Sequence, residues 1–373
     1  MSIETLQICW WIIVSILGSL VVFLLFVQGA QTLLYAIGKT GPERDILVNA
    51  LGRKWAFTFA AIILFGGAVF ASFPILGFTL FGGVNWLWMA IPAPLIIQSL
   101  AYEFKFRPTS FPGQKAYEWV LIINGFLGML FIGTAVATFF TGSAFSADKS
   151  NLTNMLDAAT IQWHHPAHGL EALLNWRNIS LGLAVFFLAR VLGILFYMNT
   201  IDDEKIVTRL KRHIIINTIP FLVFFLVFIS VILTMPGFIV RPQDEFVFGV
   251  SNKYFHNLIQ MPLVAIMLSA GTVFLLLGSA LPLANYAKNA QSGIWYAGIG
   301  AVLILFSLFC LAGLNNTAYY PSIFNVQSSL TIRNSSSSHS TLTTMSYIAL
   351  IIPVILAALW YSRTMINKKI PDN

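Results

Sequence analysis

Long apolar runs separated by short polar segments dominate the chain. Nine of them approach or exceed the roughly 20 residues that a helix needs to cross a bilayer core about 30 Å thick. The expected spans are Gln7–Ile37, Trp55–Leu80, Val84–Tyr102, Trp119–Thr141, Ile179–Met198, Ile214–Met235, Gln260–Leu283, Ile294–Leu314 and Met345–Tyr361. A spanning helix satisfies its own backbone hydrogen bonds, so the pattern predicts an all-α polytopic membrane protein.

The boundary between the second and third spans is the weakest, because only Gly82 and Gly83 separate two apolar runs. A single re-entrant segment there would leave eight spans. Lys and Arg near helix ends are retained on the cytoplasmic side. With nine spans and the N-terminus outside, most of the 21 Lys and Arg residues fall in inner loops. The charges therefore favour nine spans, with the C-terminus cytoplasmic.

The longest polar segments, Gly142–Asn178, Pro236–Ile259 and Asn315–Thr344, are then expected outside. The serine run Ser335–Ser338 is interpreted as part of a solvated loop. The first apolar run lacks a basic leader and a cleavage site, which predicts a retained span. Residues 1–373 are expected to form one membrane domain, with helical bundles at about 1–142 and 177–315 and a final helix at 345–361.

Composition supports a membrane protein and excludes other classes. Apolar residues make up 57% of the chain and charged residues only 9%, against about a quarter in soluble proteins. The net charge of +7 reflects where the loops lie, so no nucleic-acid partner is expected. Cys9 and Cys310 lie in apolar runs and indicate neither a disulfide framework nor a thiolate metal site.

Carboxylates are absent from the centres of the predicted spans. All 14 Asp and Glu residues fall in loops or near helix ends. A proton-coupled carrier ordinarily needs a buried carboxylate that titrates. A multi-span transporter is therefore disfavoured, although it stays as the alternative function.

Histidine placement bears on haem binding, because a membrane cytochrome ligates iron through His or Met inside its helices. The six histidines, His164, His165, His168, His213, His256 and His339, all fall outside the middle of a predicted span. His164 and His168 have a spacing suited to a helical metal site, but Pro166 interrupts it. We expect this chain to ligate no haem iron and no other metal, which disfavours a cytochrome in its own right.

Arg190 is the one charge deep inside a predicted span, about 16 Å from the start of that helix. It must face protein or water and needs an acceptor. Glu103, backbone carbonyls, a cavity water or an acid on another polypeptide would serve. A structural arginine bonded to carbonyls is an equally good interpretation.

Two amides, Gln28 and Gln31, share one face near the inner end of the first span. Such amides either join helices through hydrogen bonds or line a wet path, and joining is favoured. Glu103 closes the third span in the segment Tyr102-Glu-Phe-Lys-Phe-Arg107, a type of cluster that often only anchors a helix end.

Several motifs together resemble a known family. They are Trp10-Trp11, then Tyr102-Glu-Phe-Lys105 followed by Glu118-Trp119, and near the C-terminus Pro321, Ser329-Leu-Thr-Ile-Arg-Asn-Ser-Ser-Ser-Ser338 and Thr341-Leu342 before Met345. With nine spans, the chain resembles subunit II of the cytochrome bd quinol oxidases of bacterial membranes over nearly its whole length.

The resemblance implies a haem-bearing partner, subunit I, with two b-type haems and one d-type haem. That electrogenic complex oxidises quinol and reduces dioxygen to water in the respiratory chain of the bacterial cytoplasmic (inner) membrane. Subunit II would be a non-catalytic scaffold in contact with lipid and quinone, and a small single-helix subunit is a further possible partner.

The chain departs from the family at acidic positions. Gln28-Gly-Ala-Gln31 stands where the family commonly has Asp-Gly-x-x-Asp, and Lys54-Trp55-Ala56 where it has His-Trp-Asp. An amide or a methyl group cannot relay a proton as a carboxylate does. Our hypothesis is that protons enter mainly through subunit I. Gln28, Gln31, Trp55, Glu103 and Arg190 then become candidates for a water path or an interface, with Arg190 meeting a carboxylate or haem propionate of the partner.

Overall fold

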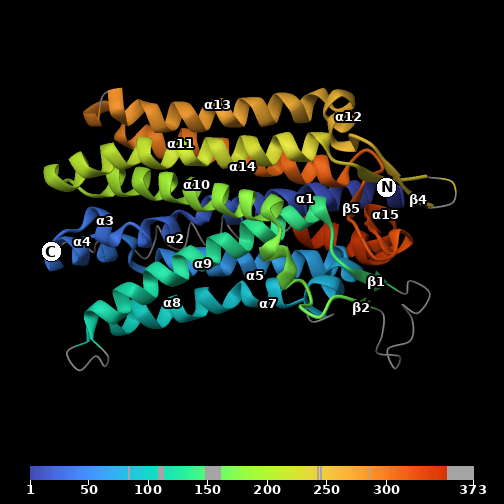
Figure 1. Ribbon diagram of the computed structural model, residues 1–373, viewed down its shortest axis with the longest axis horizontal. Helices are drawn as coiled ribbons and strands as arrows, with labels where there is room; N and C mark the ends of the chain where they lie inside the picture. The colour runs from blue at the N-terminus through green and yellow to red at the C-terminus, as the bar shows by residue number, and fades with distance from the viewer. Residues whose placement is uncertain are drawn as a thin grey trace, which may run out of the picture.

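A computed structural model describes residues 1–82, 85–107, 113–147, 161–241, 243, 246–284 and 286–350. Most helices run along the long axis of the molecule and form a bundle (Figure 1). Within the described residues, eight helices are long and apolar enough to span a membrane: Ile3–Gln31, Gly41–Ser72, Trp86–Phe104, Gln114–Thr141, Trp176–Thr200, Glu204–Thr234, Pro262–Ala284 and Ser292–Gly313. The predicted all-α multispanning fold is confirmed. Residues 339–350 are helical, but most of the ninth predicted span lies outside the described residues.

The helices have the following bounds. The first half holds α1 (Ile3–Leu24), α2 (Phe26–Gln31), α3 (Leu34–Ile37), α4 (Gly41–Leu51), α5 (Trp55–Ser72), α6 (Pro74–Gly77), α7 (Trp86–Ala90), α8 (Pro92–Phe104) and α9 (Gln114–Thr141). The second half holds α10 (Trp176–Thr200), α11 (Glu204–Thr234), α12 (Lys253–Gln260), α13 (Pro262–Ala284), α14 (Tyr286–Gly313) and α15 (Ile332–Ser335). Shorter helical turns are η1 (Gly52–Lys54), η2 (Phe78–Gly82), η3 (Leu170–Leu174) and η4 (Val326–Ser328).

The second span ends earlier than the sequence predicts. Helix α5 ends at Ser72 rather than Leu80, because Pro74 lacks a backbone N–H and pushes Phe73 out of the helical region. Asn85 then begins a new helix, since its side chain accepts a hydrogen bond from Leu87 N at 3.1 Å. The two apolar runs therefore form separate helices, each long and apolar enough to be a candidate span.

Helix α10 lies at the centre of the bundle and packs on α2, α9 and α11. Glycines allow the closest approaches: a Cβ at Gly29 would lie 2.0 Å from Ala189 O, and one at Gly193 2.5 Å from Ala30 N. The Tyr197 hydroxyl donates to Ala30 O at 3.3 Å across the same contact. Small residues at such crossings give membrane helices the van der Waals contact that holds them together.

Three two-stranded antiparallel sheets gather at the end of the bundle where the N-terminus lies (Figure 1). They pair β1 (Phe145–Ala147) with β2 (Ile161–Trp163), β3 (Gly237–Val240) with β4 (Val247–Val250), and β5 (Ala318–Tyr320) with β6 (Leu330–Thr331). All three belong to the long polar segments that the sequence places outside. Which side of a membrane this end faces stays a prediction.

The serine run Ser335–Ser338 is only in part the solvated loop that the sequence suggested, since Ser338 alone is exposed. Ser335 is fully buried and hydrogen-bonds the Tyr319 hydroxyl, and Ser337 donates from its backbone N to Ser72 O at 2.9 Å. The end of α5 exposes carbonyl groups that have no helical partner, and the serines satisfy them. The run therefore ties the last described segment to the second span.

Helix α1 is tied to the same late segments. Gln7 Nε2 donates to Ser336 Oγ at 2.6 Å, and the Trp10 indole donates to Ser346 Oγ at 3.0 Å. The Trp11 indole donates to Phe309 O at 3.2 Å. The N-terminal end of the first span is thus completed by residues some 300 positions later in the chain.

Candidate functional site at the charged end of the bundle

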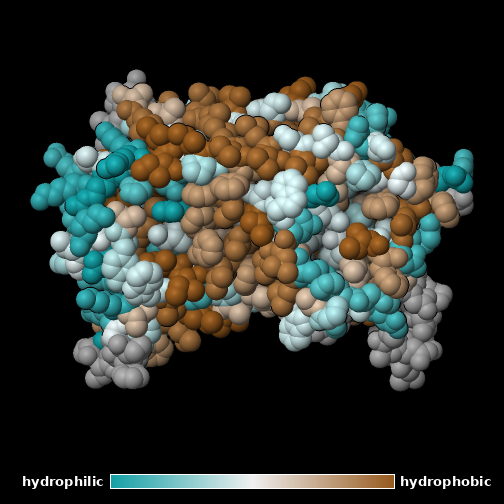
Figure 2. All heavy atoms as spheres, in the orientation of Figure 1, coloured by the Kyte–Doolittle hydropathy of each residue, from teal (hydrophilic) through white to brown (hydrophobic). Residues whose placement is uncertain are grey.

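Hydrophilic residues cover the end of the bundle opposite the small sheets, and an apolar belt occupies the middle (Figure 2). The ion pairs Arg44–Glu118 and Arg209–Glu43 lie at this end, which we call the charged end. The charged end carries α3, α4 and the adjoining ends of α10 and α11 (Figure 1). Four of the five candidate residues lie in the elements that meet here or just inside it: Gln28, Gln31, Trp55 and Glu103. The fifth, Arg190, lies deeper in α10.

Three buried amides form a cluster between α2 and α8, which we call the amide cluster: Gln28, Gln31 and Gln98. Nε2 of Gln31 donates to Gln98 Oε1 at 2.9 Å, and Nε2 of Gln28 reaches the same oxygen at 3.3 Å. All three side chains are fully buried. The sequence analysis identified Gln28 and Gln31 as candidates but missed Gln98. This residue joins both of them to α8.

Aromatic residues close the amide cluster on the α8 side. Gln31 Nε2 also donates to the Tyr102 hydroxyl at 2.9 Å, and the Trp55 ring stacks on Tyr102 with centroids 6.4 Å apart. Two candidates, Gln31 and Trp55, therefore contact Tyr102, and Gln28 joins them through Gln98. Gln28 Oε1, Gln31 Oε1 and Gln98 Nε2 find no hydrogen-bond partner among the described residues.

A second group of charges, the Glu118 cluster, consists of Tyr35, Arg44, Asp45, Lys105 and Glu118. The Glu118 carboxylate is 4% exposed, lies 2.9 Å from Arg44 Nε and 3.2 Å from Lys105 Nζ, and accepts the Tyr35 hydroxyl at 2.8 Å. Lys105 is fully buried and also meets Asp45 at 2.7 Å. Burial is tolerated because every charge has a partner of opposite sign.

Sequence reasoning missed the Glu118 cluster because its members lie far apart along the chain. Glu118 falls near the start of a span, where a carboxylate usually faces water, and nothing in its neighbours predicts burial. The usable signal was that Arg44, Lys105 and Glu118 all lie at helix ends on the same predicted side. The cluster joins α4, α8 and α9.

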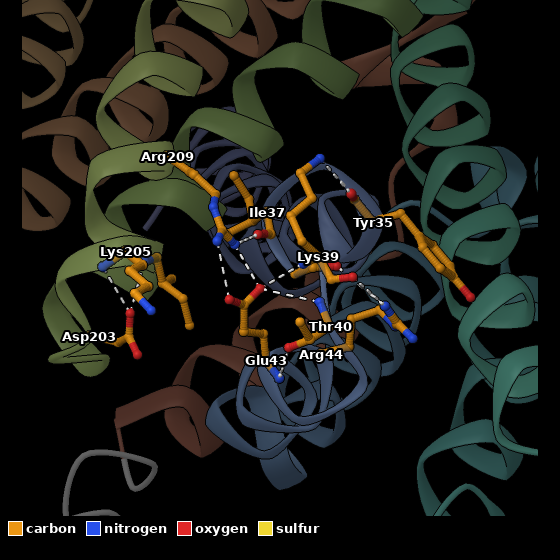
Figure 3. Close-up of polar contacts among 11 residues, drawn as sticks. Tyr35, Ile37, Lys39, Thr40, Glu43, Arg44, Asp203, Lys205 and Arg209 are labelled. Atoms are coloured by element: carbon orange, nitrogen blue, oxygen red, sulfur yellow. Dashed lines mark hydrogen bonds and ion pairs between the residues drawn. The ribbon is translucent and has the colours of Figure 1, made fainter.

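Glu43 and Arg209 form a third contact, which joins α4 to α11 (Figure 3). The guanidinium donates through both nitrogens to the two carboxylate oxygens, at 2.7 and 3.1 Å. Glu43 Oε2 also accepts from the backbone N of Lys39 at 2.7 Å and of Thr40 at 3.3 Å, completing a capping box at the start of α4. A two-point pair of this kind fixes orientation as well as distance.

Glu103, a candidate from sequence, stays at the surface. Its side chain is 68% exposed and pairs with Arg107 at 3.0 Å, one helical turn away. It makes no contact with Arg190 or with the amide cluster among the described residues. An exposed pair of this type contributes little to stability.

Arg190 lies on α10 beside α11. Its guanidinium is 5.2 Å from the Phe186 ring centroid, and its Nε has no hydrogen-bond partner in the described parts of the chain. The Arg190 charge interacts electrostatically with His213 of α11. The sequence placed His213 just before the sixth span, but α11 begins at Glu204, capped by Asp203, so His213 lies within a continuous helix. Hydropathy marks the apolar part of a helix and not its true start.

No metal site is evident in the part of the chain that the structure describes: it holds no group of three or more His, Cys, Asp or Glu side chains suited to a metal ion. The polar groups at the charged end instead pair with one another. Their arrangement joins helices, and the unpaired amide atoms can bind a water molecule.

A family model described as cytochrome bd terminal oxidase subunit II matches residues 6–366, nearly the whole chain. The chain belongs to this family. Three curated relatives carry similar names. "Probable cytochrome oxidase subunit 2" of Haemophilus influenzae is 26% identical, with 95% of this chain and 92% of the relative covered. "Cytochrome bd-I ubiquinol oxidase subunit 2" of Escherichia coli K12 is 22% identical over the same shares. "Cytochrome bd ubiquinol oxidase subunit 2" of Bacillus subtilis is 25% identical over 43% of this chain and 51% of the relative.

The solved bd oxidase from Geobacillus thermodenitrificans has the same fold, with a TM-score of 0.55 at 13% identity, covering 97% of this chain and 99% of that one. As a bd oxidase subunit II, the chain is a multi-pass membrane component of an oxidoreductase complex and has a partner subunit I. The transporter alternative finds no support in these comparisons.

Proposed function

We propose that this subunit II is a scaffold that ligates no haem in a quinol:oxygen oxidoreductase of the bacterial inner membrane. Family membership supports the assignment to the complex, and the Escherichia coli relative is named a ubiquinol oxidase subunit. The observation that carries the scaffold role is the amide cluster. Neutral amides that hydrogen-bond one another occupy the place where a proton route would need groups that titrate.

The proposed complex has the haem-bearing subunit I as the partner of this chain. Subunit I would carry two b-type haems and one d-type haem, with quinol as electron donor. Lipid, quinone and a small single-helix subunit would be further partners. The isolated chain is then expected to show no Soret band, whereas purification through a tag on this chain brings down a haem-bearing polypeptide.

The α5 surface is the best supported docking face for subunit I. Only 17% of the residues in the most apolar stretch of its span are buried within this chain, the smallest share among the described spans. Gly66 and Gly67 present a smooth strip where a Cβ would meet nothing within 4 Å, and Phe57 and Ile63 are 66% and 59% exposed. Small residues beside large apolar ones suit close helix packing by a second membrane protein.

A proton route through this chain is not part of the proposal. An amide accepts no proton at neutral pH, so the amide cluster can hold water but cannot store a proton between steps. Uptake would fall mainly to subunit I. The Glu118 cluster does not change this, because the Glu118 carboxylate is already held by Arg44 and Lys105.

The scaffold role is tested by apolar substitution in the assembled complex. Gln28→Leu, Gln31→Leu and Glu103→Leu are made singly, and quinol-driven oxygen uptake is measured per haem. We expect turnover within about twofold of the parent, since a general acid–base group would contribute roughly a hundredfold or more. A large loss of turnover with haem content intact would contradict the scaffold role.

A further inference from the structure

A pocket of about 150 Å³ lies at the end of the bundle that carries the N-terminus and the small sheets (Figure 1). Its wall is formed by the first turns of α1, the end of α14 with the turn that follows, Val240 of β3 and the start of α15. A cavity of this volume accommodates a group about the size of benzene. The pocket is open to the surface, since Glu4 and Ile8 in its wall are 61% and 45% exposed.

Hydrogen bonds between distant segments hold the wall of this pocket in place. Val240 donates from its backbone N to Asn316 O at 2.8 Å. Asn315, in the turn after α14, donates from Nδ2 to Asn257 Oδ1 at 2.9 Å. The pocket is therefore preformed, and a ligand that enters it requires little ordering of the protein.

Two opposite charges belong to the pocket wall. Arg333 Nη2 lies 3.1 Å from Glu4 Oε1. A guanidinium has five N–H donors, so Arg333 can also donate to a phosphate. Glu4 attracts an ammonium, and so does the end of α14 at Gly313, because the last carbonyls of a helix carry partial negative charge. The pocket thus offers one position for an anion and one for a cation.

Apolar side chains continue from the pocket along α1. Residues four apart lie on one face of a helix, and Glu4 is followed at this spacing by Ile8, Ile12, Ile16 and Leu20. Ile8, Ile16 and Leu20 are 45%, 42% and 40% exposed. This apolar row offers a track for an acyl chain that begins directly below the charges.

The pocket lies at the level where lipid headgroups meet a membrane protein. One candidate span begins at Ile3, next to Glu4, and another ends at Gly313, which lines the pocket. The polar headgroups of a bilayer lie directly outside the hydrocarbon that such spans cross. The charges and the apolar row are therefore placed as the two parts of a phospholipid are.

We propose that this pocket binds the headgroup of a phospholipid that carries a primary ammonium. Arg333 would hold the phosphate, and Glu4 together with the end of α14 would hold the ammonium. A choline headgroup has no N–H to donate, and the Glu4 carboxylate repels an anionic headgroup. The proposal goes beyond the scaffold function and does not depend on it.

Subunit I is the competing occupant of this surface, and the geometry of α1 favours lipid. A Cβ at Gly18 would lie 3.1 Å from the Phe65 ring, so this side of α1 faces α5, the proposed docking helix. Gly18 is two residues from both Ile16 and Leu20, which places it about 200° around the helix from them. The apolar row therefore points away from α5.

The test uses the assembled complex after delipidation, with native mass spectrometry to count bound molecules. The probes are phosphatidylethanolamine, phosphatidylcholine and phosphatidylglycerol with the same acyl chains, and glycerophosphoethanolamine as the headgroup without chains. We expect phosphatidylethanolamine to bind most tightly and the chain-free headgroup most weakly. Arg333→Gln should lower phosphatidylethanolamine affinity about fivefold, the equivalent of about 1 kcal/mol for one charged contact. Glu4→Gln should lower it by a similar factor and remove the preference over phosphatidylglycerol.

Arg107→Gln is the matched control, because Arg107 also pairs with an exposed carboxylate but lies at the charged end of the bundle. It should leave phosphatidylethanolamine binding unchanged. Parent-like affinity of Glu4→Gln and Arg333→Gln, in complexes with full haem content, would overturn the proposal. So would equal binding of the three lipids, or equal binding of the chain-free headgroup, which would indicate a soluble ligand. Density for subunit I inside the pocket would also contradict it.

Discussion

The Lys105 ammonium lies 3.2 Å from the Glu118 carboxylate, in a place where water reaches neither side chain to a significant degree. The pair joins the end of α8 to the start of α9, and Arg44 adds α4 to the same carboxylate. Because both charges are buried, each depends on the other. Removing one leaves a buried charge with too little compensation.

Glu118→Gln should therefore destabilise the assembled complex by about 3 kcal/mol or more, since it leaves Arg44 without a carboxylate partner and Lys105 with Asp45 alone. The measurement is the thermal midpoint of haem release or of loss of oxidase activity. Glu103→Gln is the matched control at an exposed pair and should change stability by less than about 1 kcal/mol. Equal midpoints for the two variants would contradict the proposed importance of the Glu118 cluster.

Gly29→Ala should prevent normal packing of α2 on α10. The added methyl would lie 2.0 Å from Ala189 O, and backbone atoms on both sides cannot move away cheaply. We expect a loss of at least about 1 to 3 kcal/mol, seen as a lower yield of assembled complex. Gly41→Ala, where a Cβ meets nothing within 4 Å, should assemble normally. Normal assembly of both variants would show that the contact is looser than described.

Gln98→Leu should lower the thermal stability of the complex more than the removal of a peripheral hydroxyl on the same helix does. It removes the acceptor of Gln28 and one of the two acceptors of Gln31, and an unpaired buried amide costs about 1 to 3 kcal/mol. Ser99→Ala, on the next residue, removes only a local bond to Ile96 O and serves as control. The thermal midpoint of the complex should be clearly lower for Gln98→Leu than for Ser99→Ala. Equal midpoints would show that Gln98 does not hold the two helices together.

The stability of the protein should depend on pH through Lys253, which lies at the end of the molecule opposite the Glu118 cluster. Its ammonium is buried and donates to Asn315 O at 3.0 Å, and burial lowers its pKa from 10.5 to about 8. A folded-state pKa below the unfolded one means that the protonated lysine opposes folding, so stability should rise as pH increases from about 8 to about 10.5. The full change is about 3 kcal/mol.

The check is the difference in thermal midpoint between the parent and Lys253→Met across that pH window, which removes the contribution of other titrating groups. The parent should gain stability relative to the variant as pH rises. Lys205→Met, at an exposed lysine, should run parallel to the parent. A parallel course for Lys253→Met would show that Lys253 stays hydrated.

The spans were predictable because bilayer thickness imposes a length on every apolar run, and eight such helices occur among the described residues. The early end of α5 was not, because Pro74 sits inside an apolar run that hydropathy cannot divide. Burial of Ser335 was missed for a related reason. A serine run has the composition of a loop, and its partners, Tyr319 for Ser335 and Ser72 for Ser337, meet it only in the fold.

The candidate site was predictable in part. Polar residues inside apolar runs are visible in sequence, and this brought out Gln28, Gln31 and Arg190. Their partners were not visible, since Gln98 and Glu118 acquire their surroundings from helices that meet only in the fold. Which of these residues lie in a water path or at an interface stays a prediction.

The attachment of Trp10 and Trp11 to residues 309–346 has a consequence for biogenesis. A ribosome delivers the first span to the membrane long before the segments that satisfy its two indoles exist. The first span therefore lacks the hydrogen-bond acceptors of Trp10 and Trp11 until synthesis nears completion. A chain released early would therefore leave both indole N–H groups of the first span without these acceptors.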